Sequence, residues 1–472
     1  MLASLGGSAL TRRAATLLRS TVLAAALTMA SRGAAQGDVS PAQPVIPLRT
    51  FNLNDFGAVA DARTLNTDAF RLAIAAVEKA GGGTLVVPGG IYLTGPIVLC
   101  SRINLHLDSG ATILFSPHEM PSADGRMPPL LLARSAHDIE VSGAGTINGS
   151  GEAWWPSVHE FMKKRGPRPA RPYLVSFDGC QRVRIEGVTL THSPEFTLVP
   201  THCQDVTIDG ISIYNPADDV TEIDGVAPEQ IWKNLQKTWD DESPNTDGID
   251  PMVSQRVLIA NCRVDTGDDC IAIKANEGGV TQDILITDCT FLHGHGCTVG
   301  SGEKGGLRNM TVRRCTFMGT LVGINLESAR DRGSLIENIT YSDITMKDVG
   351  EALILTCYYP NGALAERPFS GKFISDLANL GHDKAQPVTA TTPHWLNITI
   401  RNVTATCIWE AGLILGLPEM PAERIVLDHV DIRAPLGIHI NYAKDISLHD
   451  VHITAKHGQA VMVSDTVEGL KQ

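Results

Sequence analysis

The stretch VRIEGVTL, residues 183–190, returns along the chain in a form that decides the fold. It alternates apolar and polar residues, turns at a glycine, and then resumes the alternation. The same template begins again at residues 206, 257, 284, 310, 339, 398, 425 and 446. Where no insertion intervenes, the segments are roughly 21 to 29 residues apart, which is the period of a stacked β-solenoid.

Alternation with a period of two buries one face of a strand, but a single turn of chain cannot cover that face alone. Stacked turns form a continuous core, because each strand pairs with the equivalent strands above and below it. We therefore predict an all-β solenoid. Its corner residues suit tight bends; they are Gly187, Gly210, Asn261, Asp288 and Asn402. A β-sandwich is the alternative, although its loops do not usually return with one constant motif.

Two further features fit a solenoid. Cys262, Cys289 and Cys315 share one template position, which predicts a ladder of small core residues; disulfides are the alternative. The ten cysteines include no C-x-x-C pair, which argues against a disulfide scaffold. Residues 67–83 show helical spacing and end in glycines. We expect a helix there that caps the N-terminal end of the stack, because an open end is an exposed sheet edge.

The net charge of −13 argues against a nucleic-acid partner, which requires a basic surface. Residues 1–35 resemble an export signal, with arginines at the start, an apolar run over 21–30 and small residues before 36. The run is short for a bilayer span, although a membrane anchor is the alternative. We predict a signal peptide (1–35), a linker (36–50) and one domain (51–472) of a soluble monomer. The protein would be exported to the periplasm or the extracellular space, with no membrane association after signal removal.

Two insertions interrupt the repeat, at residues 217–243 and 358–395. We expect a short helix in the first and irregular structure in the second. Insertions in solenoids project from one face and often wall a binding groove.

Four polar loops follow strands of successive repeats. They are SPNTDGIDP (243–251), TGDDCIAI (266–273), HGHG (293–296) and GINLES (323–328). Equivalent turns of a solenoid lie along one side, so these loops are expected to share one cleft. The predicted cleft contains Asp247, Asp268, Asp269, His295 and the segment 325–327.

Three carboxylates in one cleft suit hydrolysis of a glycosidic bond. One must donate a proton to the leaving oxygen, and another must be ionised to activate water. Repulsion among them raises the pKa of one and keeps it protonated. Asp268 and Asp269 need a local bend to face the same way, which Gly267 would permit. The alternatives are solvated turn aspartates, or a metal site at HGHG, which lacks an obvious third ligand; we therefore expect no metal.

The motifs NTDG at 245, GDDC at 267 and GHG at 294 resemble the signature loops of glycoside hydrolase family 28, the polygalacturonases and their relatives. Segments 51–74, 81–99 and 193–216 are also similar to that family. The resemblance covers roughly residues 50–455.

The resemblance implies a right-handed, single-stranded parallel β-helix that hydrolyses α-linked pectic glycans by single displacement with inversion, without a cofactor. It implies that Asp268 is the general acid, and that Asp247 and Asp269 activate water. His295 would support the acid, and Asn245 would contact the substrate. The implied partner is a pectic polysaccharide or oligosaccharide.

One departure from the family concerns its Arg-Ile-Lys motif, whose cations hold a galacturonate carboxylate. Here Asn325 and Glu327 occupy the two cationic positions, and both are candidate substrate-binding residues. A carboxylate at 327 would repel a uronate, although Arg330 or Arg332 could compensate. We therefore predict a pectic hydrolase whose leaving-side sugar is neutral, as in rhamnogalacturonan. A pectic lyase, or a glycan-binding solenoid without catalysis, is the alternative.

Some aromatic residues remain ambiguous. Trp154 and Trp155, like Tyr358 and Tyr359, could stack on sugar faces or pack an insertion against the solenoid. Arg171 is expected to position its loop.

Overall fold

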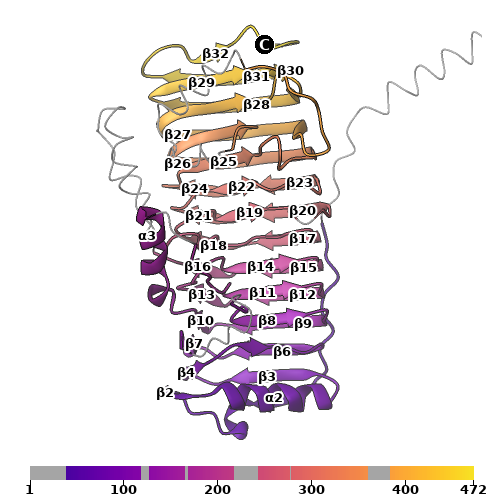
Figure 1. The fold of residues 1–472 in the computed structure, drawn as a ribbon, viewed down its shortest axis with the longest axis vertical. Helices are drawn as coiled ribbons and strands as arrows, with labels where there is room; N and C mark the ends of the chain where they lie inside the picture. Colours follow the sequence, from indigo (N-terminus) through magenta and orange to yellow (C-terminus); the bar gives the residue numbers. More distant parts are fainter. Residues whose placement is uncertain (1–38, 119–126, 165–167, 217–242, 277, 360–382) are drawn as a thin grey trace, which may run out of the picture. The chain divides into compact units, whose positions relative to one another are not determined.

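The computed structural model describes residues 39–118, 127–164, 168–216, 243–276, 278–359 and 383–472. The predicted signal peptide, the helix expected in the first insertion and most of the second insertion lie outside the described residues. Residues 39–472 form one compact unit. Its strands coil into a parallel β-helix, whose turns are stacked in Figure 1, so the predicted solenoid is confirmed.

Each turn contributes strands to three parallel ladders. The first ladder begins with β1 (Thr50–Asn52), β3 (Gly83–Val87), β6 (Ile103–Leu107), β9 (His137–Gly143), β12 (Gln181–Glu186), β15 (Gln204–Asp209), β17 (Gln255–Ala260), β20 (Thr281–Thr287) and β23 (Leu307–Arg313). The second begins with β2 (Asp61–Leu65), β4 (Gly90–Thr94), β7 (Ala111–Phe115), β10 (Thr146–Asn148), β13 (Thr189–Thr191), β16 (Ser212–Tyr214), β18 (Arg263–Asp265), β21 (Thr290–Leu292) and β24 (Thr316–Met318).

The third ladder positions the candidate site. It contains β5 (Ile97–Val98), β8 (Leu131–Arg134), β11 (Val175–Asp178), β14 (Leu198–Thr201), β19 (Ile271–Ile273), β22 (Cys297–Val299) and β25 (Val322–Glu327). The later turns merge ladders into longer strands, which are β26 (Leu335–Thr356), β27 (His394–Leu415), β28 (Ala422–Ala434), β29 (Leu436–Asn441), β30 (Ala443–Lys444), β31 (Ser447–Ala455) and β32 (Val461–Val463).

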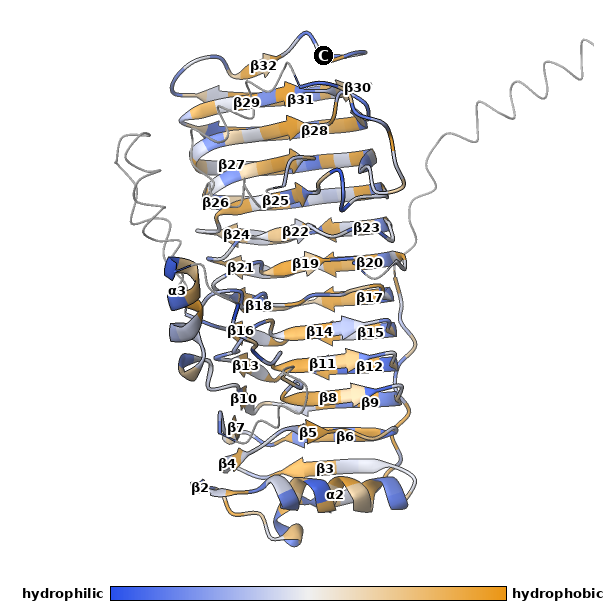
Figure 2. Ribbon diagram, viewed as in Figure 1, coloured by the Kyte–Doolittle hydropathy of each residue, from blue (hydrophilic) through white to orange (hydrophobic). Residues whose placement is uncertain are grey.

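The repeat template maps onto the first two ladders. One column of register partners contains Val183, Val206, Val257, Ile284, Met310, Ile339, Ile398 and Ile425, none more than 1% exposed. The bend between the two ladders has a left-handed residue, as at Gly187 (φ 73°) and Asn261 (φ 55°). Glycine and asparagine tolerate this conformation best, which explains the corner residues. Figure 2 shows the apolar residues concentrated on the strands.

The cysteine ladder is also confirmed. Cys289 is buried beside both Cys262 and Cys315 on adjacent turns, and all ten cysteines are free. The disulfide alternative is therefore wrong.

Within the described ranges, the helical segments are η1 (Leu53–Phe56), α2 (Thr67–Lys79), η2 (Gly151–Ala153) and α3 (Trp155–Lys164). The helix expected from residue 67 is present as α2, which packs against β1, β3 and β5 at the end of the stack (Figure 1). Among the described residues, no helix has the length and apolar character needed to cross a membrane. The described part of the expected linker lies along the stack, where the Ala42 amide donates to Asp205 (3.0 Å).

Candidate active site

The third ladder brings the four polar loops together. Ile249, in the first loop, forms parallel bridges with Leu198 of β14 and Ile271 of β19. The GDD loop enters β19, the HGHG loop enters β22, and GINLES lies largely in β25. Backbone hydrogen bonds tie the loops to one another: Gly248 donates to the Asp269 carbonyl (2.8 Å) and His295 to the Asp268 carbonyl (2.9 Å). Loops spread over about eighty residues therefore lie on successive turns along one ladder.

Asp268 lies at the accessible side of this cluster, with its side chain 19% exposed. Its Oδ1 is 3.0 Å from Nδ1 of His295, and its Oδ2 accepts a hydrogen bond from Nδ2 of Asn245 (3.3 Å). The predicted proximity of these three residues is thus present. In the other half of HGHG, Nδ1 of His293 is 2.8 Å from Oδ1 of Asp265.

Asp269 is buried and connects the cluster to Asn325 and Glu327, the two residues that differ from the family motif. Thr298 Oγ1 donates to Asp269 Oδ1 (2.5 Å). Asn325 Nδ2 in turn donates to Thr298 Oγ1 (3.2 Å) and to Glu327 Oε2 (3.3 Å). A chain of hydrogen bonds therefore runs from Asp269 to Glu327. Thr298 was not identified from the sequence, because its role depends on register pairing between β22 and β25.

The bend expected at Gly267 is present, at residues 267 and 268. The φ of Gly267 lies outside the left-handed range, but a Cβ on it would lie 2.5 Å from the carbonyl oxygen of Ser243. The glycine therefore permits close packing of the GDD loop against the preceding loop.

Asp247 forms a buried ion pair that the sequence did not indicate. Lys274 Nζ lies 2.8 Å from Asp247 Oδ2 and 2.5 Å from Asp250 Oδ2. The same ammonium group lies 4.6 Å from the centre of the Phe196 ring. The sequence gives one signal of this ion pair. Lys274 lies two positions after Ala272, so its side chain should point to the same, outward side of the chain, beside the acidic loops.

The electrostatics separate the two adjacent aspartates. Burial, together with the negative charges of Asp268 and Asp247, raises the pKa of Asp269 to about 7. Burial acts to raise the pKa of Asp268 as well, but the charge and hydrogen bond of His295 outweigh it and lower the pKa to about 2. Of the two adjacent aspartates, Asp269 is therefore favoured to hold a proton.

Glu327 differs electrostatically from what its sequence position predicts. Burial, and then the nearby Asp269 and Glu303, raise the pKa of Glu327 well above its ordinary value. The neutral form of this carboxyl is therefore favoured, beside the amide of Asn325. Ligand atoms of Asp268, Asp269 and His295 lie within 4.8 Å of one another, a spacing that suits a shared proton and would also admit a cation.

Arg171 positions the NTDG loop, as expected. Its side chain is buried; Nη1 donates to the carbonyls of Pro194 (2.7 Å) and Pro244 (2.6 Å), and Nη2 donates to Asn245 Oδ1 (2.8 Å). Asn245, the proposed substrate contact, is therefore held from one side by Arg171 while it donates to Asp268 from the other.

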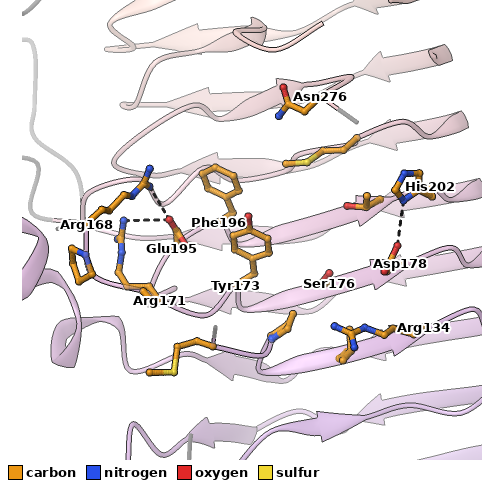
Figure 3. Close-up of a pocket in the computed structure, with 17 residues that line it drawn as sticks. Arg134, Arg168, Arg171, Tyr173, Ser176, Asp178, Glu195, Phe196, His202 and Asn276 are labelled. Atoms are coloured by element: carbon orange, nitrogen blue, oxygen red, sulfur yellow. Dashed lines mark hydrogen bonds and ion pairs between the residues drawn. The ribbon is translucent and has the colours of Figure 1, made fainter. Parts of the chain in front are cut away.

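A cavity of about 780 Å³ is drawn in Figure 3. Two of its lining residues contact the cluster: Arg171 donates to Asn245, and the Phe196 ring lies beside the Lys274 ammonium group. The stacked rings of Tyr173 and Phe196, with centroids 5.1 Å apart, form its centre. Its charged lining residues are Arg134, Arg168, Arg171, Asp178 and Glu195. Arg168 pairs with Glu195 (2.8 Å), whereas Arg134 has no hydrogen-bonding partner in the described part of the chain. Cations outnumber acids here, although the whole chain is acidic.

The remaining sequence candidates lie as follows. Trp155 is buried in α3 and donates to the Ser193 carbonyl (3.0 Å), so it packs the helix onto the stack. Arg330 pairs with Asp383 (2.6 Å) and Glu419 (2.6 Å), and is not available as a uronate clamp.

Arg332 and Tyr359 lie nearer the cluster. Arg332 donates to Ser301 Oγ (2.8 Å), and its guanidinium carbon lies 5.2 Å from the centre of the Tyr359 ring. The nearby carboxyl group of Glu327, followed by burial and the carboxyl groups of Asp268 and Asp269, raises the pKa of Tyr359. This tyrosine therefore faces the same cleft, whereas Tyr358 Oη donates to Asp383.

Comparison with known proteins is consistent with this geometry. A family model described as "Glycosyl hydrolases family 28" matches residues 83–408. A probable polygalacturonase from Vitis vinifera is 28% identical over 409 residues, which cover 81% of this chain and 74% of that protein. A polygalacturonase from Ralstonia nicotianae is 29% identical over 64% of this chain, and the match spans only 62% of that protein.

A solved structure is also similar. The hyperthermoactive exopolygalacturonase from Thermotoga maritima superposes with a TM-score of 0.70 at 25% sequence identity, covering 89% of this chain and 95% of that one. The exopolygalacturonase from Yersinia enterocolitica shares the fold with a TM-score of 0.72 at 19% identity, covering 90% of this chain and 78% of that one.

Proposed function

Because the chain belongs to family 28 of the glycosyl hydrolases, we propose that it hydrolyses an α-glycosidic bond of a pectic polysaccharide by single displacement, with inversion. The observation that carries this proposal is the convergence of Asp247, Asp268, Asp269 and His295 on adjacent turns. An acid, a pair that activates water and a histidine beside the acid are what this reaction requires.

We assign the general acid to Asp268, because it is the more accessible of the adjacent aspartates and can reach a glycosidic oxygen. In the free protein the charge of His295 favours its ionised form. A sugar that covers Asp268 removes water from it, and desolvation raises the pKa of a carboxyl group. Substrate binding thus favours transfer of the proton from Asp269 to Asp268. Asp269 and Asp247 then accept the proton of the attacking water.

The two sides of the cleft differ in charge, and this supports a bond between unlike sugars. On one side, Asn325 and the neutral carboxyl of Glu327 offer no cation to a uronate. On the other side, the cavity in Figure 3 presents Arg134 and Arg168 around an aromatic floor. We propose a substrate with a uronate on the cavity side and a neutral leaving-side sugar, as in rhamnogalacturonan.

The test is a panel of defined pectic oligosaccharides and polymers, with product analysis by mass spectrometry and NMR of the newly formed anomer. We expect hydrolysis of the mixed uronate–neutral polymer, an inverted anomer, and little turnover of polygalacturonate. Efficient cleavage of polygalacturonate would refute the substrate assignment, and unsaturated products that absorb in the ultraviolet would indicate a lyase instead.

The role of Asp268 has its own test. Asp268→Asn should abolish hydrolysis of the natural polymer while the circular dichroism spectrum is retained. The aryl group of an aryl glycoside leaves as a phenolate and needs no proton from an acid. The variant should therefore keep much of its activity on such a substrate. If Asp269→Asn, and not Asp268→Asn, is the variant rescued by the aryl leaving group, the acid is Asp269.

We also propose that the protein is exported as a monomer, after removal of residues 1–35. The apolar run and the small residues before position 36 support cleavage there. N-terminal sequencing of protein recovered outside the cytoplasm tests this, and an intact N-terminus would contradict it.

A further inference from the structure

We infer that Lys274 is a positioning residue for the proposed hydrolysis, and that its ammonium group holds Asp247 as the ionised carboxylate that accepts a proton from water. This inference depends on the proposed function. It assigns a role to Lys274, which lies outside the acidic loops.

The contacts of Lys274 are fixed from several directions. The residue forms a bridge with Met252 just after β19 ends, and its carbonyl accepts a hydrogen bond from Thr281 Oγ1 (2.6 Å). Its side chain is 11% exposed, and Nζ lies between Asp247 (2.8 Å) and Asp250 (2.5 Å). The ammonium group therefore has little freedom to leave the two carboxylates.

Both carboxylates use one oxygen for the lysine and keep the other unpaired. In the described part of the chain, Oδ1 of Asp247 and Oδ1 of Asp250 have no hydrogen-bond partner. The unpaired oxygen of Asp247 is buried beside the acid cluster, and we assign to it the proton from water while Lys274 holds the other oxygen. For Asp250, whose side chain is fully buried, no route to substrate is present, so it acts as the second counter-ion of the lysine.

The groups around Asp247 make its ionisation depend on the ammonium group of Lys274. The charged and titratable groups that face Lys274 and Asp247 are Asp250, Asp268, Asp269, Glu303, Glu195, Arg171 and Tyr173. Most of them are acidic. The other cation, Arg171, already donates to two carbonyls and to Asn245. Without Lys274, Asp247 would lie among carboxylates with no direct ion pair, and it would take up a proton at a higher pH.

A purely structural ion pair and a positioning residue predict different pH profiles. A base must be ionised, so kcat/KM falls as the pH drops through the pKa of Asp247. Loss of an opposite charge at this distance raises the pKa of a carboxyl by about 1 to 3 units. A residue that only stabilises the fold would lower the melting temperature but leave the acidic limb of the profile in place.

The experiment compares pH profiles of kcat/KM for wild type, Lys274→Gln, Asp250→Asn and a control, Lys347→Gln, on the polymer that wild type hydrolyses. Lys347 is exposed on β26 and faces away from the cleft ladder. For Lys274→Gln we expect the acidic limb to move up by about 1 to 3 pH units. For Asp250→Asn, the acidic limb should lie at the same pH as in wild type or at a lower pH, because Lys274 then forms an ion pair with Asp247 alone. Lys347→Gln should match wild type.

Breaking a buried ion pair can prevent folding, so the double variant Lys274→Gln/Asp250→Asn is included, which removes one charge of each sign. Its acidic limb should also lie above that of wild type. A folded Lys274→Gln or double variant with an unmoved limb would overturn the inference while leaving the proposed function intact. A wild-type protein that cleaves none of the pectic polymers would remove the proposed function, and the inference with it.

Discussion

Replacement of Asp269 by asparagine should inactivate the protein and stabilise it at the same time. The side chain is 8% exposed, and its Oδ1 accepts a hydrogen bond from Thr298, which an asparagine oxygen can also accept. The substitution therefore keeps the shape and the contact, and removes only a buried charge. Loss of a group that takes part in proton transfer typically lowers the rate by about 10²–10⁴-fold.

The stability gain follows from the pKa. An unfolded aspartate ionises near 3.8, and the folded one near 7, so the folded state binds the proton more tightly. Between these values the wild type loses stability as the pH rises, and above pH 7 the loss is complete. A difference of about three units corresponds to roughly 4 kcal/mol at pH 8, and to roughly 2 kcal/mol at pH 5. Asp269→Asn should be more stable than wild type by these amounts.

The assay is urea unfolding of wild type and variant at pH 8 and pH 5, followed by tryptophan fluorescence. Acids that do not interact with Asp269 titrate alike in both proteins and cancel in the difference. Asp268, Asp247 and Glu327 lose a repelling neighbour in the variant, which acts in the same direction as the expected gain. Asp465→Asn, at an exposed position, should show no gain at either pH. The reasoning is refuted if Asp269→Asn is no more stable than wild type at pH 8, or if its gain is the same at both pH values.

Three further outcomes are expected. Glu303 is fully buried, and burial raises its pKa to about 8, so Glu303→Gln should raise the melting temperature at pH 8 more than at pH 5; equal shifts at both would contradict this. The double change Asn325→Arg/Glu327→Lys should raise kcat/KM on polygalacturonate by about tenfold or more, since charge-assisted hydrogen bonds contribute about 1.5–3 kcal/mol; no gain would argue against a missing uronate clamp. Trp155→Phe removes the hydrogen bond to Ser193 and should lower the free energy of unfolding by about 1–3 kcal/mol with activity retained, as checked by urea unfolding and a turnover assay.

The fold was predictable because its determinants are local and repeated. The template seen at Val183 and its equivalents sets strand, corner and face on every turn, and each corner needs a residue that tolerates a left-handed conformation. Convergence of the acid loops followed from the period alone. The helix from residue 67 was also visible, because its spacing and its terminal glycines are local signals.

The electrostatics of the site were not predictable from the sequence. Lys274 lies just after β19, and its pairing with Asp247 depends on which segment lies on the neighbouring turn. Glu327 reads as a negative charge, but its burial, which only the fold reveals, favours the neutral form. The bend at Gly267 was predictable, whereas the close approach of this residue to Ser243 depends on the neighbouring turn.

The hydrogen bonds from Asp269 to Thr298 and from Thr298 to Asn325 step from one turn to the next, and the last one reaches Glu327 within β25. Neighbouring strands of a sheet are spaced by about 4.8 Å, so two steps measure out roughly 10 Å along the groove. The spacing of the strands thereby fixes the distance between Asp269, a proposed catalytic residue on one turn, and Asn325 and Glu327, the proposed sugar contacts on another. Replacing residues 322–327 with the equivalent segment of a relative would therefore change which sugar is recognised without displacing Asp269.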